Sequence, residues 1–122
     1  ADAGEQFTVR LLQSDPRLDT VRFAAETYDA VVLAALAATI AEDDGGVSIA
    51  RAIRTAMTGG VVCGSFGECL DALDNDQTVN YDGVSGPLDI DEVGDIVGAE
   101  LSVLRYDASN RPQPDGALSL RP

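Results

Sequence analysis

The segment Thr20–Ala41 carries apolar residues at helical spacing. Neither Pro nor Gly interrupts it, and Asp19 stands where its side chain can cap the first turn. Apolar residues recur at intervals of three and four positions, which is the pattern of a helix packed against a core. We therefore predict one long helix here, with a kink or a break near Glu26-Thr27 as the alternative. Its apolar positions are Val21, Ala24, Ala25, Tyr28, Val31, Val32, Ala35, Leu36 and Ile40.

Two shorter segments carry weaker patterns. Phe7, Val9 and Leu11 alternate as in a strand, yet Phe7 and Leu11 also lie one helical turn apart, so helix and strand both stay open. Ser48–Met57 shows helical spacing again, and Gly59-Gly60 closes that helix.

The pattern then changes from helical to strand-like. Ser65–Glu68 fits a capping box that begins a short helix ending near Leu73. Val79–Tyr81 and Leu101–Tyr106 read as strands. Three prolines near the C-terminal end predict a flexible tail over residues 108–122. Helices followed by short strands indicate a mixed α/β chain with too few strands for a sheet of its own.

The charge of the chain and its lack of His argue against several classes of function. The chain has 21 acidic residues against 8 basic ones, a net charge of −13, and it has no His. Such a surface repels phosphates, so we expect no nucleic-acid partner. The commonest general base and metal ligand is missing, and Gly64-Ser65-Phe66-Gly67 is not a nucleophile elbow. We predict no catalytic residue, no metal site and no cofactor, and therefore no enzyme.

Two cysteines, Cys63 and Cys69, stand six positions apart. The spacing is neither a redox C-x-x-C motif nor a zinc pattern, and by itself it leaves two unrelated buried thiols open. The even count and the capping box between the two residues favour a disulfide, which implies an oxidising compartment.

Two stretches resemble a known family. Residues 26–37, ETYDAVVLAALA, resemble a helix of the type I periplasmic-binding-fold receptors that serve branched-chain amino acid and amide ABC transporters. Residues 79–95, VNYDGVSGPLDIDEVGD, resemble a later segment of the same family, and the intervening cysteine pair is similar to one found in some members. The resemblance covers roughly Phe7 to Asp107.

The resemblance implies a two-lobed α/β fold. In this family solute binds between the lobes, and closure of the cleft presents the receptor to a membrane permease. Residues 1–78 would be second-lobe helices, residues 79–107 a hairpin and a hinge strand returning toward the first lobe, and residues 108–122 the tail. Because full members are much longer, the chain would be a fragment of such a fold.

The resemblance also implies candidate ligand-binding residues, two within the first motif and one, Phe23, five positions before Tyr28. By resemblance, Phe23 would line the cleft against an aliphatic ligand side chain, and Tyr28 and Asp29 would border it. Each also has a plainer interpretation, Phe23 as a core residue and the other two as residues that orient the start of the helix.

An acidic loop offers a separate alternative. Asp89, Asp91, Gly94 and Glu100 match positions 1, 3, 6 and 12 of a calcium loop, but Val93 at position 5 has no side-chain oxygen. A plain strand–turn–strand is the competing interpretation. If calcium bound here, the chain would be a small calcium-stabilised extracellular domain.

The sequence thus predicts part of an extracytoplasmic receptor, periplasmic or a cell-surface lipoprotein. It would capture amino acids or related small solutes for an ABC importer, with the permease as its partner. The alternative is a stand-alone extracellular interaction or sensor module without a transport role. We expect the isolated chain to self-associate through the Val21–Ile40 helix and the Leu101–Tyr106 strand edge, because both would have lost neighbours.

Overall fold

The computed structural model describes residues 3–86 and 88–120. Pro87 of the second motif and residues 121–122 of the predicted tail lie outside this range. The chain divides into two units, Ala1–Leu88 and Asp89–Pro122, which are described separately. Helices and strands both occur, so the mixed α/β class is confirmed at that level.

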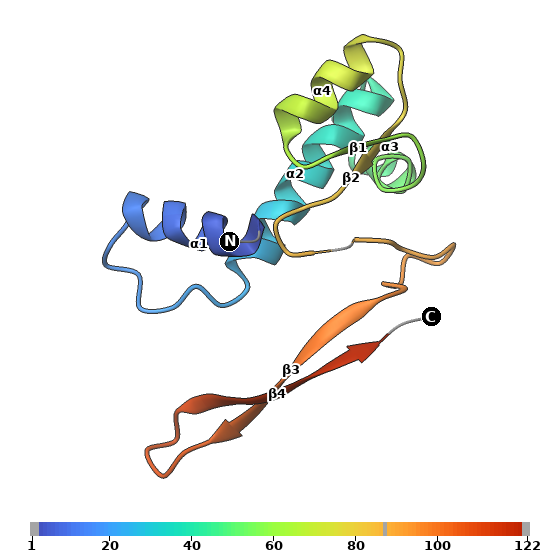
Figure 1. The fold of residues 1–122 in the computed structure, drawn as a ribbon. Helices are drawn as coiled ribbons and strands as arrows, with labels where there is room; N and C mark the ends of the chain where they lie inside the picture. The colour runs from blue at the N-terminus through green and yellow to red at the C-terminus, as the bar shows by residue number, and fades with distance from the viewer. Residues whose placement is uncertain (1–2, 87, 121–122) are drawn as a thin grey trace. The chain divides into compact units, whose positions relative to one another are not determined.

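The first unit contains four helices and a small parallel sheet (Figure 1). The long helix α2 packs against α3 and α4, and α4 packs against both strands. The elements are α1 (Ala3–Ser14), α2 (Ala24–Ala41), α3 (Gly46–Ala52), β1 (Val61–Cys63), α4 (Phe66–Asp74) and β2 (Val79–Tyr81). The largest fully buried side chains are Tyr81, Leu36, Val79, Asp29 and Cys69.

Helix α2 begins later than the apolar pattern predicts. Its first residue is Ala24, and the preceding residue, Phe23, has left-handed backbone angles with no side-chain cap. The prediction that Asp19 caps this helix is therefore wrong. Thr20 Oγ1 accepts a hydrogen bond from the Arg22 backbone N–H at 3.2 Å, and this local turn competes with the first helical turn.

The other three helices can be compared with the predictions made from the sequence. The segment around Phe7 is helical, as α1, and not a strand. The predicted Ser48–Met57 helix is shorter, since α3 ends at Ala52 and residues 53–57 continue as turns. Helix α4 begins as predicted, with the Ser65 side chain accepting the Glu68 backbone N–H.

The parallel pair β1–β2 joins segments on either side of α4. Val61 pairs with Val79 and Cys63 with Tyr81, so the carboxyl ends of both strands lie at one edge. Gly60 makes this approach possible, because a Cβ there would lie 2.2 Å from the Thr78 carbonyl oxygen. The boundary predicted after residue 78 falls within this unit, since β2 pairs with β1.

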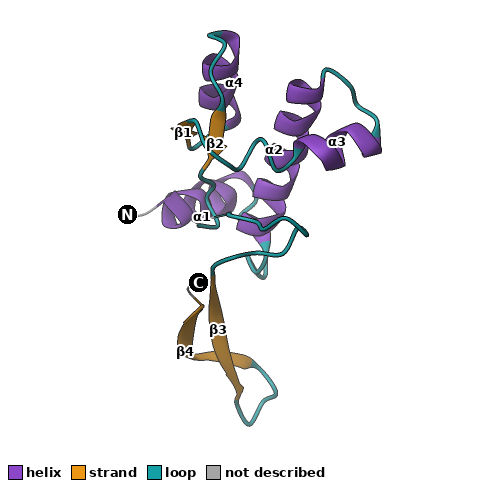
Figure 2. Cartoon of the chain, turned by 90° about the vertical axis from the view of Figure 1, so that its right-hand side faces the viewer, coloured by secondary structure: helices purple, strands orange, loops and turns teal. Residues whose placement is uncertain are grey.

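The second unit is built around an antiparallel hairpin. Strand β3 (Ala99–Tyr106) pairs with β4 (Pro112–Leu120), as Figure 2 shows. The prediction of a flexible tail over 108–122 is thus corrected, because Pro112 and Pro114 sit within a two-stranded ribbon, where a missing N–H can face outward. The register shifts after Val103, which leaves Asp115 as an extra residue on β4.

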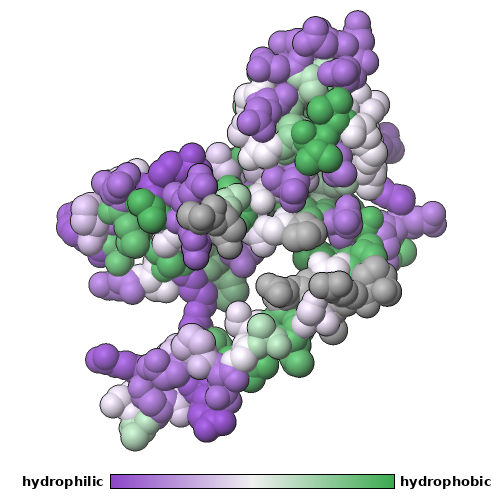
Figure 3. All heavy atoms as spheres, in the orientation of Figure 1, coloured by the Kyte–Doolittle hydropathy of each residue, from purple (hydrophilic) through white to green (hydrophobic). Residues whose placement is uncertain are grey.

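Many large apolar side chains stay at the surface (Figure 3). Among the helices that the structure describes, α2 is long and apolar enough to cross a membrane, although core helices and signal sequences pass the same test of length and composition. Here α2 also buries the carboxylate of Asp29 together with Leu36 and Ala37. In the structure, 28% of this helix is buried.

Candidate functional site

A buried carboxylate connects α2 to the loop that follows β2. Asp29 is only 1% exposed, and its two oxygens accept four hydrogen bonds. Oδ1 accepts the Tyr81 hydroxyl at 2.7 Å and the Val84 backbone N–H at 3.0 Å. Oδ2 accepts the Ser85 backbone N–H at 2.7 Å and also the Ser85 hydroxyl. We call this arrangement the Asp29 lock.

The loop of the lock requires a glycine. A Cβ at Gly83 would lie 2.4 Å from Cγ of Asp29, a distance that no side-chain carbon tolerates. Gly83 and Gly86 also form an antiparallel bridge, so the loop turns back on itself next to the carboxylate. The Asp-Gly-Val-Ser-Gly run therefore shapes a backbone cradle around Asp29.

Hydrogen-bond donors, and not a positively charged side chain, surround the buried carboxylate of Asp29. None of the ion pairs in the described part of the chain involves Asp29. Burying an unpaired carboxylate is costly unless donors replace water, and charge-assisted hydrogen bonds do so. Burial raises the pKa of Tyr81 far above its usual range, and its hydrogen bond to Asp29 and the charge of Asp29 raise it further. The phenol therefore stays protonated as a donor.

A disulfide fastens the neighbouring loop at the same sheet edge. Cys63 and Cys69 are bonded, with their Cα atoms 5.2 Å apart, which confirms the prediction. Between them, the Glu68 side chain accepts the backbone N–H of Gly64, the residue before the Ser65 N-cap, at 2.8 Å, and the Ser65 hydroxyl accepts the Glu68 backbone N–H. The Asp82 backbone N–H donates to the Cys63 carbonyl at 2.9 Å. The loops that follow β1 and β2 are thus fixed beside each other.

The three predicted ligand-binding residues have different surroundings. Phe23 is 68% exposed and holds the left-handed conformation (φ 61°), which is strained for a bulky residue. Tyr28 is 40% exposed and contacts Phe7, with the ring centroids 5.2 Å apart. Asp29 has both oxygens engaged within the lock. The side chains of Phe23 and Tyr28 are therefore accessible at the surface, whereas the carboxylate of Asp29 is used to hold the loop after β2.

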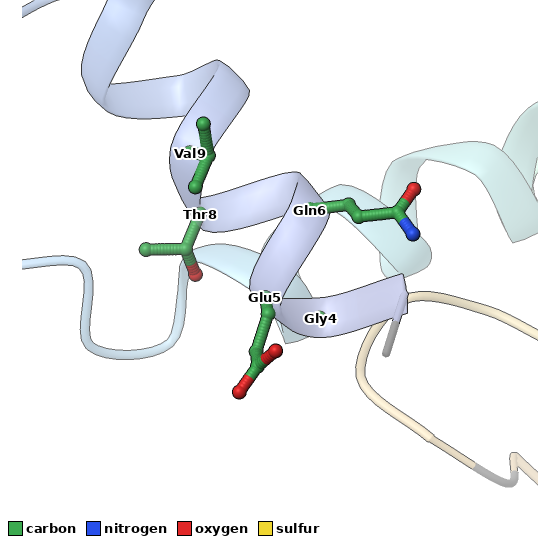
Figure 4. A pocket seen from close by; sticks show the side chains of 5 residues that line it. All are labelled: Gly4, Glu5, Gln6, Thr8 and Val9. Carbon is green, nitrogen blue, oxygen red and sulfur yellow. The ribbon is translucent and has the colours of Figure 1, made fainter. Parts of the chain in front are cut away.

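An open hollow of about 660 Å³ lies along α1 and contains none of the predicted site residues. It is lined by Gly4, Glu5, Gln6, Thr8 and Val9. Figure 4 shows these side chains pointing in different directions, without converging on one point. The hollow therefore lacks the arrangement of a binding site.

Residues 91–95 of the candidate calcium loop form a turn, and the side chain of Glu100, at position 12, lies outside the described residues. The Asp91 carboxylate accepts the backbone N–H groups of Val93 and Asp95 at 2.9 and 3.0 Å. Among the side chains that the structure describes, no three from His, Cys, Asp or Glu are grouped so that they could hold a metal ion. The geometry of this loop is that of an Asx turn.

Comparison with protein-family models, curated proteins and solved structures finds no match to this chain.

Proposed function

We propose that this chain is part of an extracytoplasmic solute-binding protein of the type I periplasmic-binding fold. It would contribute second-lobe helices and strands to a receptor that captures amino acids or related small solutes for an ABC importer. The observation that carries the proposal is the Asp29 lock. Asp29 lies in the first motif that resembles this family, and all four of its donors lie in the second.

The lock also accounts for the composition of both motifs. Tyr81 and Ser85 supply donors, and Gly83 leaves room for the carboxylate. Two motifs that meet in a specific side-chain network support the resemblance better than either motif does by itself. An Ala-rich helix or an Asp-Gly turn taken singly is common.

The position of the lock supports ligand capture. Ligands of open α/β sheets bind outside the carboxyl ends of the strands. The loops after β1 and β2 leave from that edge, and the disulfide and the lock hold them in place. Rigid loops at a strand end present a preformed surface, which lowers the entropic cost of binding.

The disulfide also fits an extracytoplasmic location, because structural disulfides persist in oxidising compartments. A receptor that meets solute outside the membrane would fold in such a compartment. The location therefore agrees with capture for import.

Phe23 is the residue that we assign to the solute. An exposed aromatic ring held in a strained backbone conformation offers an apolar contact for an aliphatic side chain. One lobe supplies only part of a zwitterion's polar contacts, so its charges would be desolvated without compensation. We therefore expect no useful affinity of the isolated chain for free Leu, Ile or Val.

Calorimetry on two proteins tests the proposal. The isolated chain is titrated with Leu, Ile and Val, and so is the product of the full reading frame that encodes it. We expect binding by the full product alone, weakened by Phe23→Ala. Val47→Ala is the matched control, since Val47 is exposed to a similar degree, at 66%. Micromolar binding by the isolated chain would overturn the proposal. A reading frame of only this length would favour the stand-alone module.

A further inference from the structure

Strand β3 has a free edge. Among the described residues, the sheet of the second unit contains β3 and β4 only. Figures 1 and 2 both show these two strands as one twisted ribbon. An edge strand presents unpaired N–H and C=O groups to any other extended backbone.

The turn of the hairpin determines which groups face that edge. The Asp107 backbone N–H donates to the Arg111 carbonyl at 3.0 Å, so this pair is hydrogen-bonded. Pairs alternate along an antiparallel ladder, so Tyr106–Pro112 and Leu104–Pro114 are the non-hydrogen-bonded pairs. The backbone groups of Leu104 and Tyr106 therefore point away from β4.

The same alternation continues toward the start of β3. It turns the N–H and C=O groups of Glu100 and Ser102 to the free edge as well. The edge thus offers four residues with both backbone groups available, spaced two apart. This is the complete set that one more antiparallel strand requires.

The outer edge of β4 is different. Pro112 and Pro114 occupy outward-facing positions there, where proline has no N–H to donate. The extra residue Asp115 interrupts the ladder on the same strand and pairs with Arg105 at 2.8 Å. Prolines and bulges are the devices by which proteins block sheet edges. The hairpin therefore has one open edge and one blocked edge.

The hairpin is also nearly neutral in a very acidic chain. From Ala99 to Leu120 there are three acidic residues and two arginines, a net charge of −1, against −13 for the whole chain. A second copy of this chain would meet less repulsion here than at an average stretch of its length.

We propose that two copies pair through β3, antiparallel and about a two-fold axis, to form a four-stranded sheet in the order β4–β3–β3–β4. Because each hairpin has a single open edge, pairing through that edge closes at a dimer and does not grow into a fibre. The register with the longest overlap places Val103 opposite Val103 of the second copy as a non-hydrogen-bonded pair. Four strands form a more stable sheet than an isolated hairpin. The proposal is independent of solute binding.

Disulfide trapping tests the register. In a non-hydrogen-bonded pair the Cα atoms lie about 4.5 Å apart, within the roughly 4.4–6.8 Å range of disulfides. The native cysteines are already bonded to each other, so Val103→Cys supplies one free thiol per chain. We expect mild oxidation to give a covalent dimer as the main product. Leu118→Cys on β4 is the control, exposed but on the strand away from the interface, and should form no covalent dimer under the same oxidation.

Sedimentation of the unmodified chain and of Ser102→Pro gives the second measurement. The substitution removes an N–H that faces the free edge without removing a bond to β4. We expect a dimer for the unmodified chain and a monomer for the variant, with the β3–β4 contacts retained in NMR spectra. Equal trapping of both cysteine variants, or a monomeric unmodified chain at all concentrations, would overturn the proposal.

Discussion

Replacing Asp29 by Asn tests whether the lock stabilises the first unit. The change keeps the shape of the side chain and exchanges one oxygen for an NH2 group. The hydroxyls of Tyr81 and Ser85 can rotate to accept from that group. The backbone N–H groups of Val84 and Ser85 cannot, and they face different oxygens, at 3.0 and 2.7 Å. Either orientation of the amide therefore leaves one backbone donor facing another donor.

The expected loss of stability follows from these contacts. A buried donor without a partner costs about 1–3 kcal/mol, and the remaining hydrogen bonds fall from charge-assisted to neutral strength, roughly 1 kcal/mol. Removing the charge also removes its desolvation cost, which offsets part of this loss. We expect Asp29→Asn to lower the free energy of unfolding by about 3 kcal/mol, or the melting temperature by roughly 15 °C.

Urea unfolding followed by far-ultraviolet circular dichroism measures the change. Asp71→Asn is the control, because Asp71 is exposed on α4 and its side chain takes no part in the lock. We expect the control to shift the free energy by less than about 0.5 kcal/mol. An Asp29→Asn variant as stable as the unmodified chain would refute the reasoning, since the burial of the charge would then cost as much as its hydrogen bonds contribute.

Three further changes have defined outcomes. Gly83→Ala should destabilise by about 1–3 kcal/mol through overpacking against the buried carboxylate, whereas Gly67→Ala, with open space around it on α4, should stabilise slightly; thermal melts of both compare them. Because the pKa of Tyr81 is raised in the folded state, the unfolded state ionises first. Stability should therefore fall as pH rises above the ordinary value of 10.0, and Tyr81→Phe should lose that slope in urea titrations at alkaline pH. Replacing Cys63 and Cys69 together by Ala should cost about 2 kcal/mol in the same assay, because the bond closes a short loop, and two titratable thiols in the denatured, unreduced chain would contradict the bond itself.

Some local signals in the sequence predicted the local structure, whereas the predicted Asp19 cap and the predicted end of the Ser48–Met57 helix were wrong. The capping box at Ser65–Glu68 gave α4 its start, and the alternating residues Val79–Tyr81 form β2. These features depend on hydrogen bonds and side-chain spacing within one turn or one strand. The disulfide also belongs here, because its two residues are close in sequence.

The features that escaped prediction depend on distant contacts. The bonds of the Asp29 lock join residues 52 to 56 positions apart, so no periodicity reveals them. The only signal was the joint presence of both motifs in one chain. β4 was missed because prolines normally end strands, and its pairing depends on a partner strand with a free ladder.

The disulfide and the Asp29 lock both stabilise the parallel sheet of the first unit, which would otherwise be weak. A parallel pair of strands with three residues each forms few ladder bonds, and parallel pairs are normally covered by helices on both faces. Here the disulfide ties the end of β1 to α4, and the lock ties the end of β2 to α2. Each strand end is thus held by a different helix through a different kind of bond. Loss of the disulfide should loosen the loop after β1 first, and loss of the lock should loosen the loop after β2 first. In each case the other loop should keep its hydrogen-exchange protection until the unit unfolds.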